Sequence, residues 1–223
     1  NQENYGLASA RNRGVNESSG SFLFFLDADD WIEPKALEMM YLCLMRNETY
    51  GYVFPDIYLE GKRKGFIENE FNLFEQFFLN KIPYCIFISK ECFIKHGNYD
   101  ENMKLGYEDW DLNIKLGINK IFGKRLPLSI FHYDVQDTGM LLSKSIKNHI
   151  KIWNYIKIKN SNIYKIKYLL SKWILWRKMP SSYPLVIFFV WYLFLNIMPE
   201  YLSLKLFLFM RNNNLFLKRI ISK

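Results

Sequence analysis

The sequence predicts an α/β fold, with a sheet between helices, followed by a helical C-terminal region that is both basic and apolar. One observation is the apolar run of residues 22–25, which turn formers precede and the acidic segment Leu26-Asp27-Ala28-Asp29-Asp30 follows. Bulky and aromatic residues at consecutive positions suit a strand buried on both faces of a sheet. The other observation is a change near residue 141, where lysines begin to alternate with Ile, Tyr, Trp and Leu. We therefore expect two parts, residues 1–140 and residues 141–223.

Helix and strand patterns alternate in the first part. Residues 6–17 form a predicted helix whose small and basic side chains permit close approach to a diphosphate, and residues 22–26 form the buried strand. A helix over residues 34–46 follows, because Pro34 suits a first helical turn and apolar residues recur at helical spacing, at Leu37, Met40, Tyr41, Leu44 and Met45. Residues 51–59 indicate a strand that is an edge strand or bulged, since Pro55 lacks an N–H donor.

The remaining elements of this part follow the same patterns. They are a short aromatic helix over residues 71–79, a strand over 85–89, a helix over 90–96 that Gly97 ends, a helix from Glu108 and a strand over 128–131. Between them, residues 61–65 contain three basic side chains. These would suit an anionic acceptor, but a solvated turn is the favoured interpretation.

Composition excludes several classes of protein. With 223 residues, of which 50% are hydrophobic and 18% aromatic, the chain can bury a substantial core and is not a disordered segment. Cys43, Cys85 and Cys92 are an odd number without zinc-ligand spacing, so reduced thiols in a cytoplasmic compartment are expected rather than disulfides. The net charge of +8 comes without a helix-turn-helix, zinc-finger or aromatic RNA-binding pattern, so no nucleic-acid partner is predicted.

The acidic segment is the first candidate site. Asp27 and Asp29 emerge at the carboxyl end of the predicted strand, where the ligands of open α/β sheets bind. Two carboxylates one residue apart offer hard oxygen ligands to Mg²⁺ or Mn²⁺, which also bridges protein to substrate phosphates. For an isolated Asp-x-Asp, a solvated acidic turn is the ordinary alternative.

Two blocks of sequence argue against that alternative, because together they resemble the family 2 glycosyltransferases. The first follows the pattern Asn-x-Gly-x-x-x-Ala-Arg-Asn-x-Gly, an apolar strand, Leu-Asp-x-Asp-Asp and a proline, with matches at Asn4, Gly6, Ala10, Arg11, Asn12, Gly14, Leu26, Asp27, Asp29, Asp30 and Pro34. The second, in residues 96–101 and 106–112, looks like the family's Gly-x-Phe-Asp-Glu and Glu-Asp-x-Asp-Leu segments. The resemblance covers about residues 1–140.

The resemblance implies a GT-A-like nucleotide-sugar-binding sheet and inverting transfer of a sugar from a nucleoside diphosphate to a glycan or lipid-linked acceptor. Asp109 matches the family's general base, which takes the proton of the acceptor hydroxyl. Asp27 matches its nucleotide-contacting carboxylate, and Asp29 matches the ligand of a divalent metal, Mg²⁺ or Mn²⁺, that neutralises the departing diphosphate. Glu108 and Trp110 would shape the acceptor side.

Three more residues belong to the donor side by the same resemblance: Asn4, Arg11 and Asn12. Arg11 carries a permanent, fork-shaped charge that suits a phosphate contact. On residue type alone, an ion pair with Glu17 or Asp30 is an equally good interpretation of this arginine.

Two assignments depend strongly on the resemblance. On residue type alone, Glu108, Asp109 and Asp111 are simply favourable charges in the first turn of a helix. His132 lies near the place where many family members carry a late basic or histidine residue that contacts the metal or diphosphate. Many relatives show Tyr-Arg there, and this chain departs from that pattern. His132 is thus a candidate metal ligand, with a buried or surface histidine as the alternative.

Family members carry strands and helices before the Asn-x-Gly block, so the chain is expected to begin inside the fold, with on the order of 60 residues absent. The strand at residues 22–26 would then become a sheet edge. Two other classes of function therefore stay open, an inactive binding or scaffold module and a peripheral membrane protein with a vestigial sugar-transfer domain. Metal-linked binding of a nucleoside diphosphate separates the enzyme from both.

Residues 141–223 have the composition of basic amphipathic helices that lie at a membrane surface. The apolar run of residues 184–198 is shorter than the roughly 20 residues that cross a bilayer, and Pro199 and Glu200 interrupt its continuation. We expect contact with anionic lipid at the cytoplasmic face of the membrane. The alternative is a helical subdomain that packs its apolar face on the first part or on a partner subunit.

Overall fold

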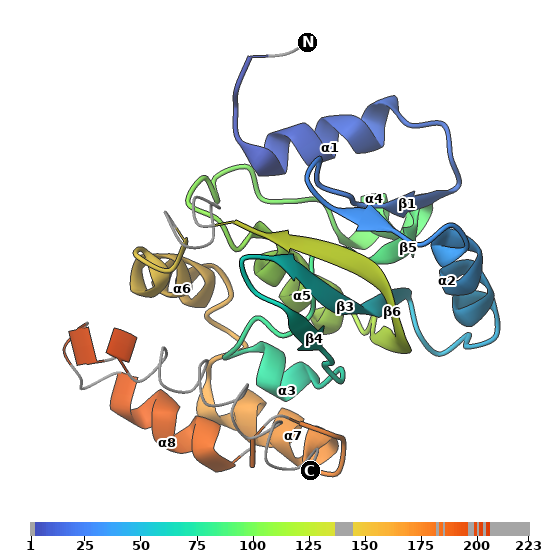
Figure 1. Ribbon diagram of the computed structural model, residues 1–223. Coiled ribbons are helices and arrows are strands. Elements are labelled where there is room, and N and C mark those ends of the chain that lie inside the picture. The colour runs from blue at the N-terminus through green and yellow to red at the C-terminus, as the bar shows by residue number, and fades with distance from the viewer. Residues whose placement is uncertain are drawn as a thin grey trace.

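One sheet with helices on both sides forms the described part of the chain (Figure 1). The computed structural model describes residues 3–136, 145–181, 183–184, 186–195, 199, 201–202 and 204–205. Its elements in chain order are α1 (Leu7–Glu17), β1 (Phe22–Phe24), β2 (Trp31–Ile32), α2 (Ala36–Met45), β3 (Tyr52–Gly61), β4 (Gly65–Ile67), α3 (Leu73–Gln76), β5 (Phe87–Ser89), α4 (Lys90–His96), α5 (Glu108–Ile118), β6 (Gly123–Val135), α6 (His149–Lys159), α7 (Ile166–Trp176) and α8 (Val186–Leu195).

The sheet is mixed. Its strand order is β1-β5-β3-β6-β2, and β4 pairs with the second half of β3. Among the described strands, β3 and β6 run parallel and the other pairs are antiparallel. β1 lies at the end of this order, which is the edge position expected for it. The prediction that it is buried on both faces is wrong, because Phe22 and Phe24 are partly exposed at that edge.

β3 is a central strand, which corrects the edge alternative for the strand that contains Pro55. β5 pairs with β3 at Tyr52 and Val53, whereas β4 pairs with it from Ile57 onward. Pro55 therefore lies where the partner strands change on one side, and the register with β6 shifts between Pro55 and Ile57 on the other. The missing N–H thus falls at an interruption of the ladder, and the predicted bulge is confirmed.

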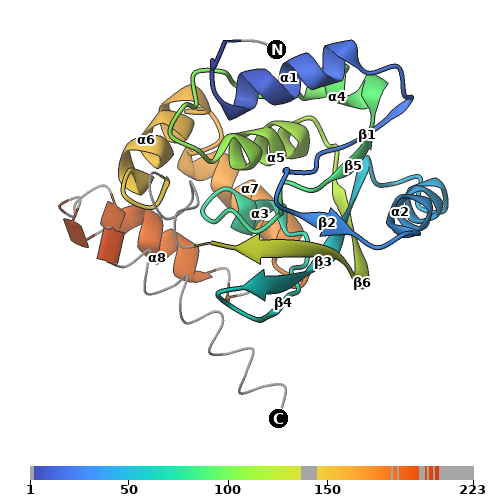
Figure 2. The same ribbon diagram turned by 45° about the horizontal axis from the view of Figure 1, so that its top comes forward.

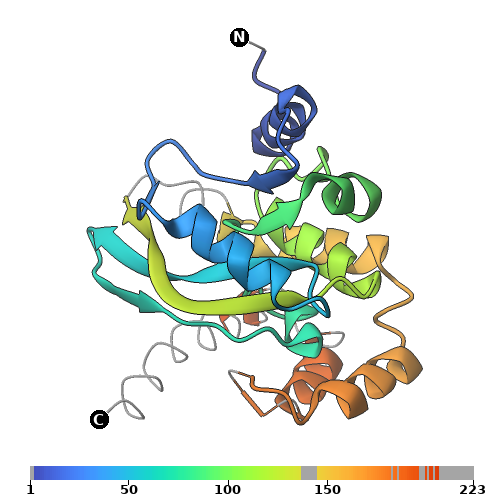
Figure 3. The same ribbon diagram turned by 90° about the vertical axis from the view of Figure 1, so that its right-hand side faces the viewer.

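α2 covers one face of the sheet (Figure 3). Ala36, Met40 and Leu44 are buried there, because residues four apart lie on one side of a helix. The predicted apolar stripe is therefore only partly correct. Its other members are exposed, namely Leu37, Tyr41 and Met45.

The opposite face is covered by α5 and α3, with the C-terminal helices beyond them (Figure 2). α6, α7 and α8 join the same hydrophobic core through Ile156, Leu169 and Phe188. The Tyr164 hydroxyl donates a hydrogen bond of 2.8 Å to the backbone carbonyl of Phe77. The alternative that these helices pack their apolar faces on the first part of the chain is therefore confirmed. No helix in the described ranges is both long and apolar enough for a membrane span, and the expected boundary at residue 140 lies outside them.

Other element predictions can be compared directly with the structure. The helices expected over residues 6–17 and 90–96 and from Glu108 are confirmed as α1, α4 and α5. The basic turn is confirmed as an exposed loop, and the aromatic helix is shorter than expected. β6 is longer than expected, so His132 lies within a strand rather than after one.

Candidate functional site

Arg11 connects the two blocks of the sequence pattern. Its Nη2 donates to Asp27 Oδ1 at 2.8 Å, and its Nη1 donates to Glu108 Oε1 at 2.7 Å. The Arg11 side chain is 8% exposed, and the Glu108 side chain is buried as well. Hydrogen bonds between ionised groups are about twice as strong as neutral ones. The guanidinium thus fixes the segment after β1 against the first turn of α5.

Two tyrosine rings enclose the same guanidinium. The Arg11 Cζ atom lies 4.7 Å from the ring centroid of Tyr84 and 5.5 Å from that of Tyr99. The carboxylate partners of Arg11 are Asp27 and Glu108. The alternative of an ion pair with Glu17 or Asp30 is therefore wrong. The pair with Glu17 is made by Arg13 instead, at 3.8 Å and in an exposed position.

Tyr84 is a site residue that the sequence pattern does not reveal. β1 and β5 are antiparallel with Phe24 opposite Phe87, and the same register places Asp27 opposite Tyr84. The Asp27 amide donates to the Tyr84 hydroxyl at 3.2 Å, and that hydroxyl donates to the carboxylate of Asp30. Only the antiparallel pairing identifies this residue, because it lies in a loop without a motif.

Asp30 is the structural member of the acidic segment. Its carboxylate accepts from the Tyr84 hydroxyl and, at 2.9 Å, from the Asp134 amide. Burial raises the pKa of Asp30 to about 6, although both hydrogen bonds act in the opposite direction. Asp30 therefore joins the end of β6 to the loop after β1 rather than facing a ligand.

The Glu108–Asp109 pair opens α5. Tyr107 precedes it in a left-handed conformation, with φ of 61° and ψ of 24°. Glu108 is buried against Arg11, whereas Asp109 is partly exposed and its Oδ2 accepts from the Asn80 side chain at 3.0 Å. Burial and the neighbouring Asp109 charge raise the pKa of Glu108 to about 7, and burial also raises the pKa of Asp109. Such a shift suits a base that works near neutral pH.

Trp110 does not lie on the surface where an acceptor would bind. It is 1% exposed, and its indole Nε1 donates to the Gln76 carbonyl at 2.6 Å. The predicted acceptor contact is therefore corrected: Trp110 anchors α5 in the core beneath Asp109. The third acidic residue of this turn, Asp111, pairs with Lys159 of α6 at 2.8 Å. The acidic residues of the first turn thus have separate partners, which a simple helix-dipole interpretation does not predict.

Asn4 and Asn12 bond to backbone. Asn4 Oδ1 accepts from the Gly6 amide at 3.1 Å, just before α1. Asn12 forms a two-way clamp on Tyr99, donating to its carbonyl and accepting from its amide, each at 2.9 Å. Asn12 also donates to the Glu101 carboxylate at 3.0 Å. These bonds hold the loop beside Arg11, and the donor-binding roles of both asparagines stay predictions.

Asp29 is exposed, unlike Asp30. Within the described ranges, no group of three or more His, Cys, Asp or Glu residues is arranged to hold a metal ion. An exposed carboxylate nevertheless fits Mg²⁺ chemistry, because this ion is often bound through one or two carboxylates, several waters and substrate phosphates. The metal role of Asp29 stays a prediction.

His132 lies between two strands and two carboxylates. Its ring stacks on Trp31, with centroids 3.5 Å apart and the planes 12° from parallel. Its Nδ1 lies 3.1 Å from Glu60 and its Nε2 lies 3.0 Å from Glu33, so both nitrogens already have partners. The predicted role as a metal ligand requires one of these contacts to open. Most of the following stretch, residues 137–140, lies outside the described residues.

The first part of the chain matches a known protein family. The model described as Glycosyl transferase family 2 matches residues 1–101, which include Arg11, Asp27 and the Asn12–Tyr99 clamp. Over these residues the chain is similar to glycosyl transferase family 2. The Glu108–Asp109 pair lies just beyond the family 2 match. Its connection with the matched residues therefore rests on the Arg11 bridge.

Curated proteins give the same family context over part of their length. The minor teichoic acid biosynthesis protein GgaB of Bacillus subtilis is 28% identical over 160 residues, which are 66% of this chain and 18% of GgaB. An uncharacterized glycosyltransferase of Haemophilus influenzae is 32% identical over 125 residues, which are 52% of this chain and 42% of that protein. The chain spans 6% to 57% of the length of the curated relatives that it matches.

Solved structures share the fold. The structure of S. aureus TarS 1-349 in complex with UDP-GlcNAc has a TM-score of 0.53 and 14% identity, over 79% of this chain and 56% of that chain. Another TarS structure has a TM-score of 0.52 and 16% identity, over 69% of this chain and 27% of that chain. This likeness confirms the GT-A-like α/β fold expected from the sequence.

Proposed function

We propose that this chain transfers a sugar from a nucleoside diphosphate to a hydroxyl of a glycan or lipid-linked acceptor, with inversion, during synthesis of a cell-surface polymer. The supporting observation is the bridge of Arg11 between Asp27 and Glu108. It brings the carboxylate assigned to the nucleotide and the pair assigned to the acceptor to one site. The relation to a teichoic acid biosynthesis protein supports the polymer class.

Asp109 is the proposed general base. Of the two adjacent carboxylates it is the more exposed, and the Asn80 amide orients one of its oxygens. Its raised pKa makes it a better proton acceptor than an ordinary aspartate. A base that takes the hydroxyl proton on the side opposite the leaving diphosphate produces inversion of the anomeric carbon. Glu108 supports this role because its negative charge keeps the Asp109 proton affinity high.

A divalent metal is the proposed cofactor, held by Asp29 together with the donor diphosphate. When bound, Mg²⁺ or Mn²⁺ neutralises the charge that develops on the departing diphosphate. Arg11 cannot supply this neutralisation alone, since two carboxylates already share its charge. The remaining demand for positive charge favours the metal over a metal-free site.

Calorimetry with the purified chain tests the donor and metal assignments together. UDP is the first nucleotide to use, because TarS has been crystallised with UDP and with UDP-GlcNAc. We expect UDP to bind in the presence of Mn²⁺ and only weakly without it. Asp29→Asn should abolish the dependence on Mn²⁺, and the exposed Glu38→Gln on α2 is the matched control. Unchanged Mn²⁺ dependence in Asp29→Asn removes this residue from the metal site.

Membrane contact is the second part of the proposal and places the protein at the cytoplasmic face of the membrane. On α7, Leu170, Ile174 and Leu175 are exposed together with Lys167, and the exposed Lys178 follows the end of the helix. An apolar stripe with flanking lysines suits the surface of an anionic bilayer.

The rivals, an inactive scaffold or a vestigial domain, predict no metal-linked nucleotide binding.

A further inference from the structure

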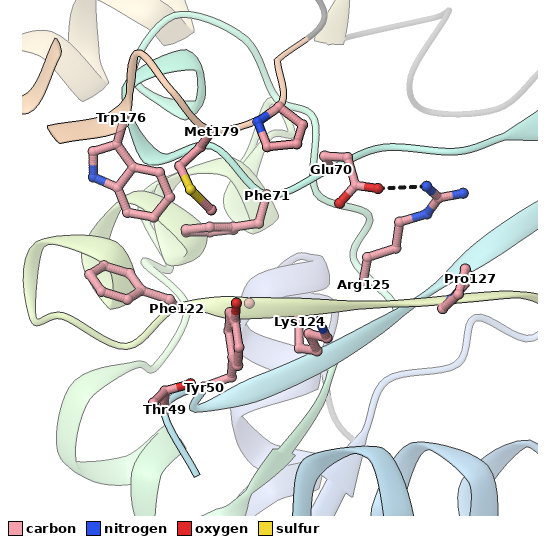
Figure 4. A pocket seen from close by; sticks show the side chains of 12 residues that line it. Thr49, Tyr50, Glu70, Phe71, Phe122, Lys124, Arg125, Pro127, Trp176 and Met179 are labelled. Atoms are coloured by element: carbon pink, nitrogen blue, oxygen red, sulfur yellow. Dashed lines mark hydrogen bonds and ion pairs between the residues drawn. The ribbon is translucent and has the colours of Figure 1, made fainter. Parts of the chain in front are cut away.

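A pocket of about 400 Å³ lies at the other end of β6 from the candidate site (Figure 4). Four segments line it: the loop before β3, the approach to α3, the start of β6 and the end of α7. Lys124 in this pocket and Asp134 beside Asp30 are both on β6, and their partners on β3, Val53 and Glu60, are seven residues apart. A strand rise of about 3.3 Å per residue therefore puts the two ends on the order of 20 Å apart. This pocket is therefore separate from the site of transfer.

One wall of the pocket is aromatic and firmly held. The Trp176 ring meets Phe71 and Phe122 edge-on, at centroid distances of 5.4 Å and 5.2 Å. The buried Asn72 side chain donates to the backbone carbonyls of Trp176 and Pro180, each at 3.2 Å. The end of α7 is thus anchored beside α3, so the wall is formed before any ligand arrives.

The opposite wall is polar but nearly balanced in charge. Arg125 binds Asp56 through two hydrogen bonds of 2.7 Å and Glu70 through one of 2.6 Å, the last marked in Figure 4. The Lys124 ammonium lies 5.3 Å from the ring centroid of Tyr50. Glu68 also lies 3.8 Å from Arg125, so two basic and three acidic groups meet here. Such a wall offers both donors and acceptors of hydrogen bonds.

We propose that this pocket binds an uncharged sugar residue. A pyranose ring has apolar C–H faces that pack on aromatic side chains, and hydroxyls that both donate and accept hydrogen bonds. Trp176 would meet the ring face, while the ammonium of Lys124 donates to hydroxyls and the carboxylate of Glu70 accepts from them. A purely apolar ligand would desolvate these charged groups without replacing their hydrogen bonds. The volume falls within the range of about 300 to 1,000 Å³ usual for small-ligand sites.

The source of this sugar follows from the proposed function, on which this step rests. A growing glycan that is extended at Asp109 has further sugar units along its chain. A second site at the other end of β6 would hold one of these distal units and keep a long acceptor bound between transfers. Short acceptors would not reach it.

The test uses the whole chain and uncharged oligosaccharides without nucleotide, with cellotetraose, maltotetraose and tetra-N-acetylchitotetraose as probes. Ligand-observed NMR titrations should show millimolar or tighter binding of at least one of them. Trp176→Ala and Lys124→Ala should each weaken this binding at least fivefold. Leu175→Ala and Lys178→Ala are the matched controls, because these neighbours do not line the pocket, and they should leave it unchanged.

The two proposals fail in different ways. Calorimetry with UDP and Mn²⁺ should give wild-type affinity in Trp176→Ala and Lys124→Ala, which also shows that the variants are folded. Thermal unfolding of both variants shows independently that they are folded, so loss of saccharide binding supports the pocket assignment even if no nucleotide binds to any form. If none of the three oligosaccharides binds the wild type, or if both pocket variants bind as well as the controls, the assignment is wrong.

Discussion

A buried arginine between two carboxylates holds a site together only while all three charges stay in place. Arg11 offsets the charges of Asp27 and Glu108, and Glu108 in turn lies next to Asp109. Removing the cation leaves buried negative charge without compensation, which typically costs more than the ion pair itself contributes. The electrostatics of the candidate site therefore depend on a residue that the family resemblance assigns to the donor side.

Arg11→Met should lower the free energy of unfolding by about 3 kcal/mol at pH 8, the lower end of the range for breaking a buried pair. The loss should be smaller at pH 5, because Glu108 can then take a proton. Urea unfolding measures both values. Arg13→Met on the same helix is the control, and it should change stability by no more than about 0.5 kcal/mol. Equal losses of unfolding free energy in the two variants would show that the bridge of Arg11 stabilises the protein no more than the exposed Arg13 does.

The rate of sugar transfer should depend on pH near neutrality. Because the pKa of Glu108 is raised to about 7 and that of Asp109 is raised with it, the pair carries an extra proton below this pH. A protonated base cannot accept the hydroxyl proton, so kcat/KM should fall as the pH drops from 8 to 6. Glu108→Gln removes one of the two like charges, and the acidic limb should move to lower pH. A limb near pH 4 in the wild type contradicts this account.

At the scale of the elements, the sequence predicted what each segment is better than where it lies. Helical spacing and capping positions were enough for α1, α4 and α5, since those signals are local. These local signals do not predict which strands are neighbours, because the antiparallel pairing of β1 with β5 depends on contacts between residues more than 60 positions apart. For this reason neither Tyr84, which contacts Asp27 and Asp30, nor Asn80, which contacts Asp109, has a signal in the sequence. The position of Pro55 likewise depends on where β5 ends and β4 begins.

Tyr84→Phe tests this strand register through stability. The hydroxyl accepts from the Asp27 amide and donates to buried Asp30, so its loss leaves two polar groups with fewer partners. We expect a decrease of about 1 to 3 kcal/mol in the free energy of unfolding. Tyr41→Phe, on the exposed face of α2, is the matched control. Thermal or urea unfolding without a difference between the two variants would mean that the Tyr84 hydroxyl is not part of a buried network.

On the scale of the whole molecule, the C-terminal helices belong to the core and also present an outer face. Ile156, Leu169 and Phe188 are buried with the rest, so deleting this region would expose the core. Composition alone did not distinguish packing from membrane contact, because one amphipathic helix can do both with opposite faces. The exposed apolar stripe of α7 is the part that the core does not use.

Sedimentation with anionic liposomes checks the membrane proposal without truncation. Ile174 and Leu175 are 57% and 66% exposed, so the double change to Asn should spare the fold. Wild-type protein should sediment with acidic vesicles at low salt and less as salt screens the lysines. The double variant should sediment at least fivefold less. Equal sedimentation of both forms, or none by the wild type, excludes this face of α7 as the membrane contact.

The central claim is that Asp109 takes the acceptor's proton, and a comparison of Asp109→Asn with Glu108→Gln tests it most directly. Both changes keep the size of the side chain, and both turnover and UDP affinity are measured. We expect Asp109→Asn to bind UDP with Mn²⁺ as the wild type does while turnover falls by about 10² to 10⁴, the usual contribution of general base catalysis. Glu108→Gln should keep measurable turnover. Near wild-type transfer by Asp109→Asn, or loss of transfer in Glu108→Gln alone, would contradict the assignment.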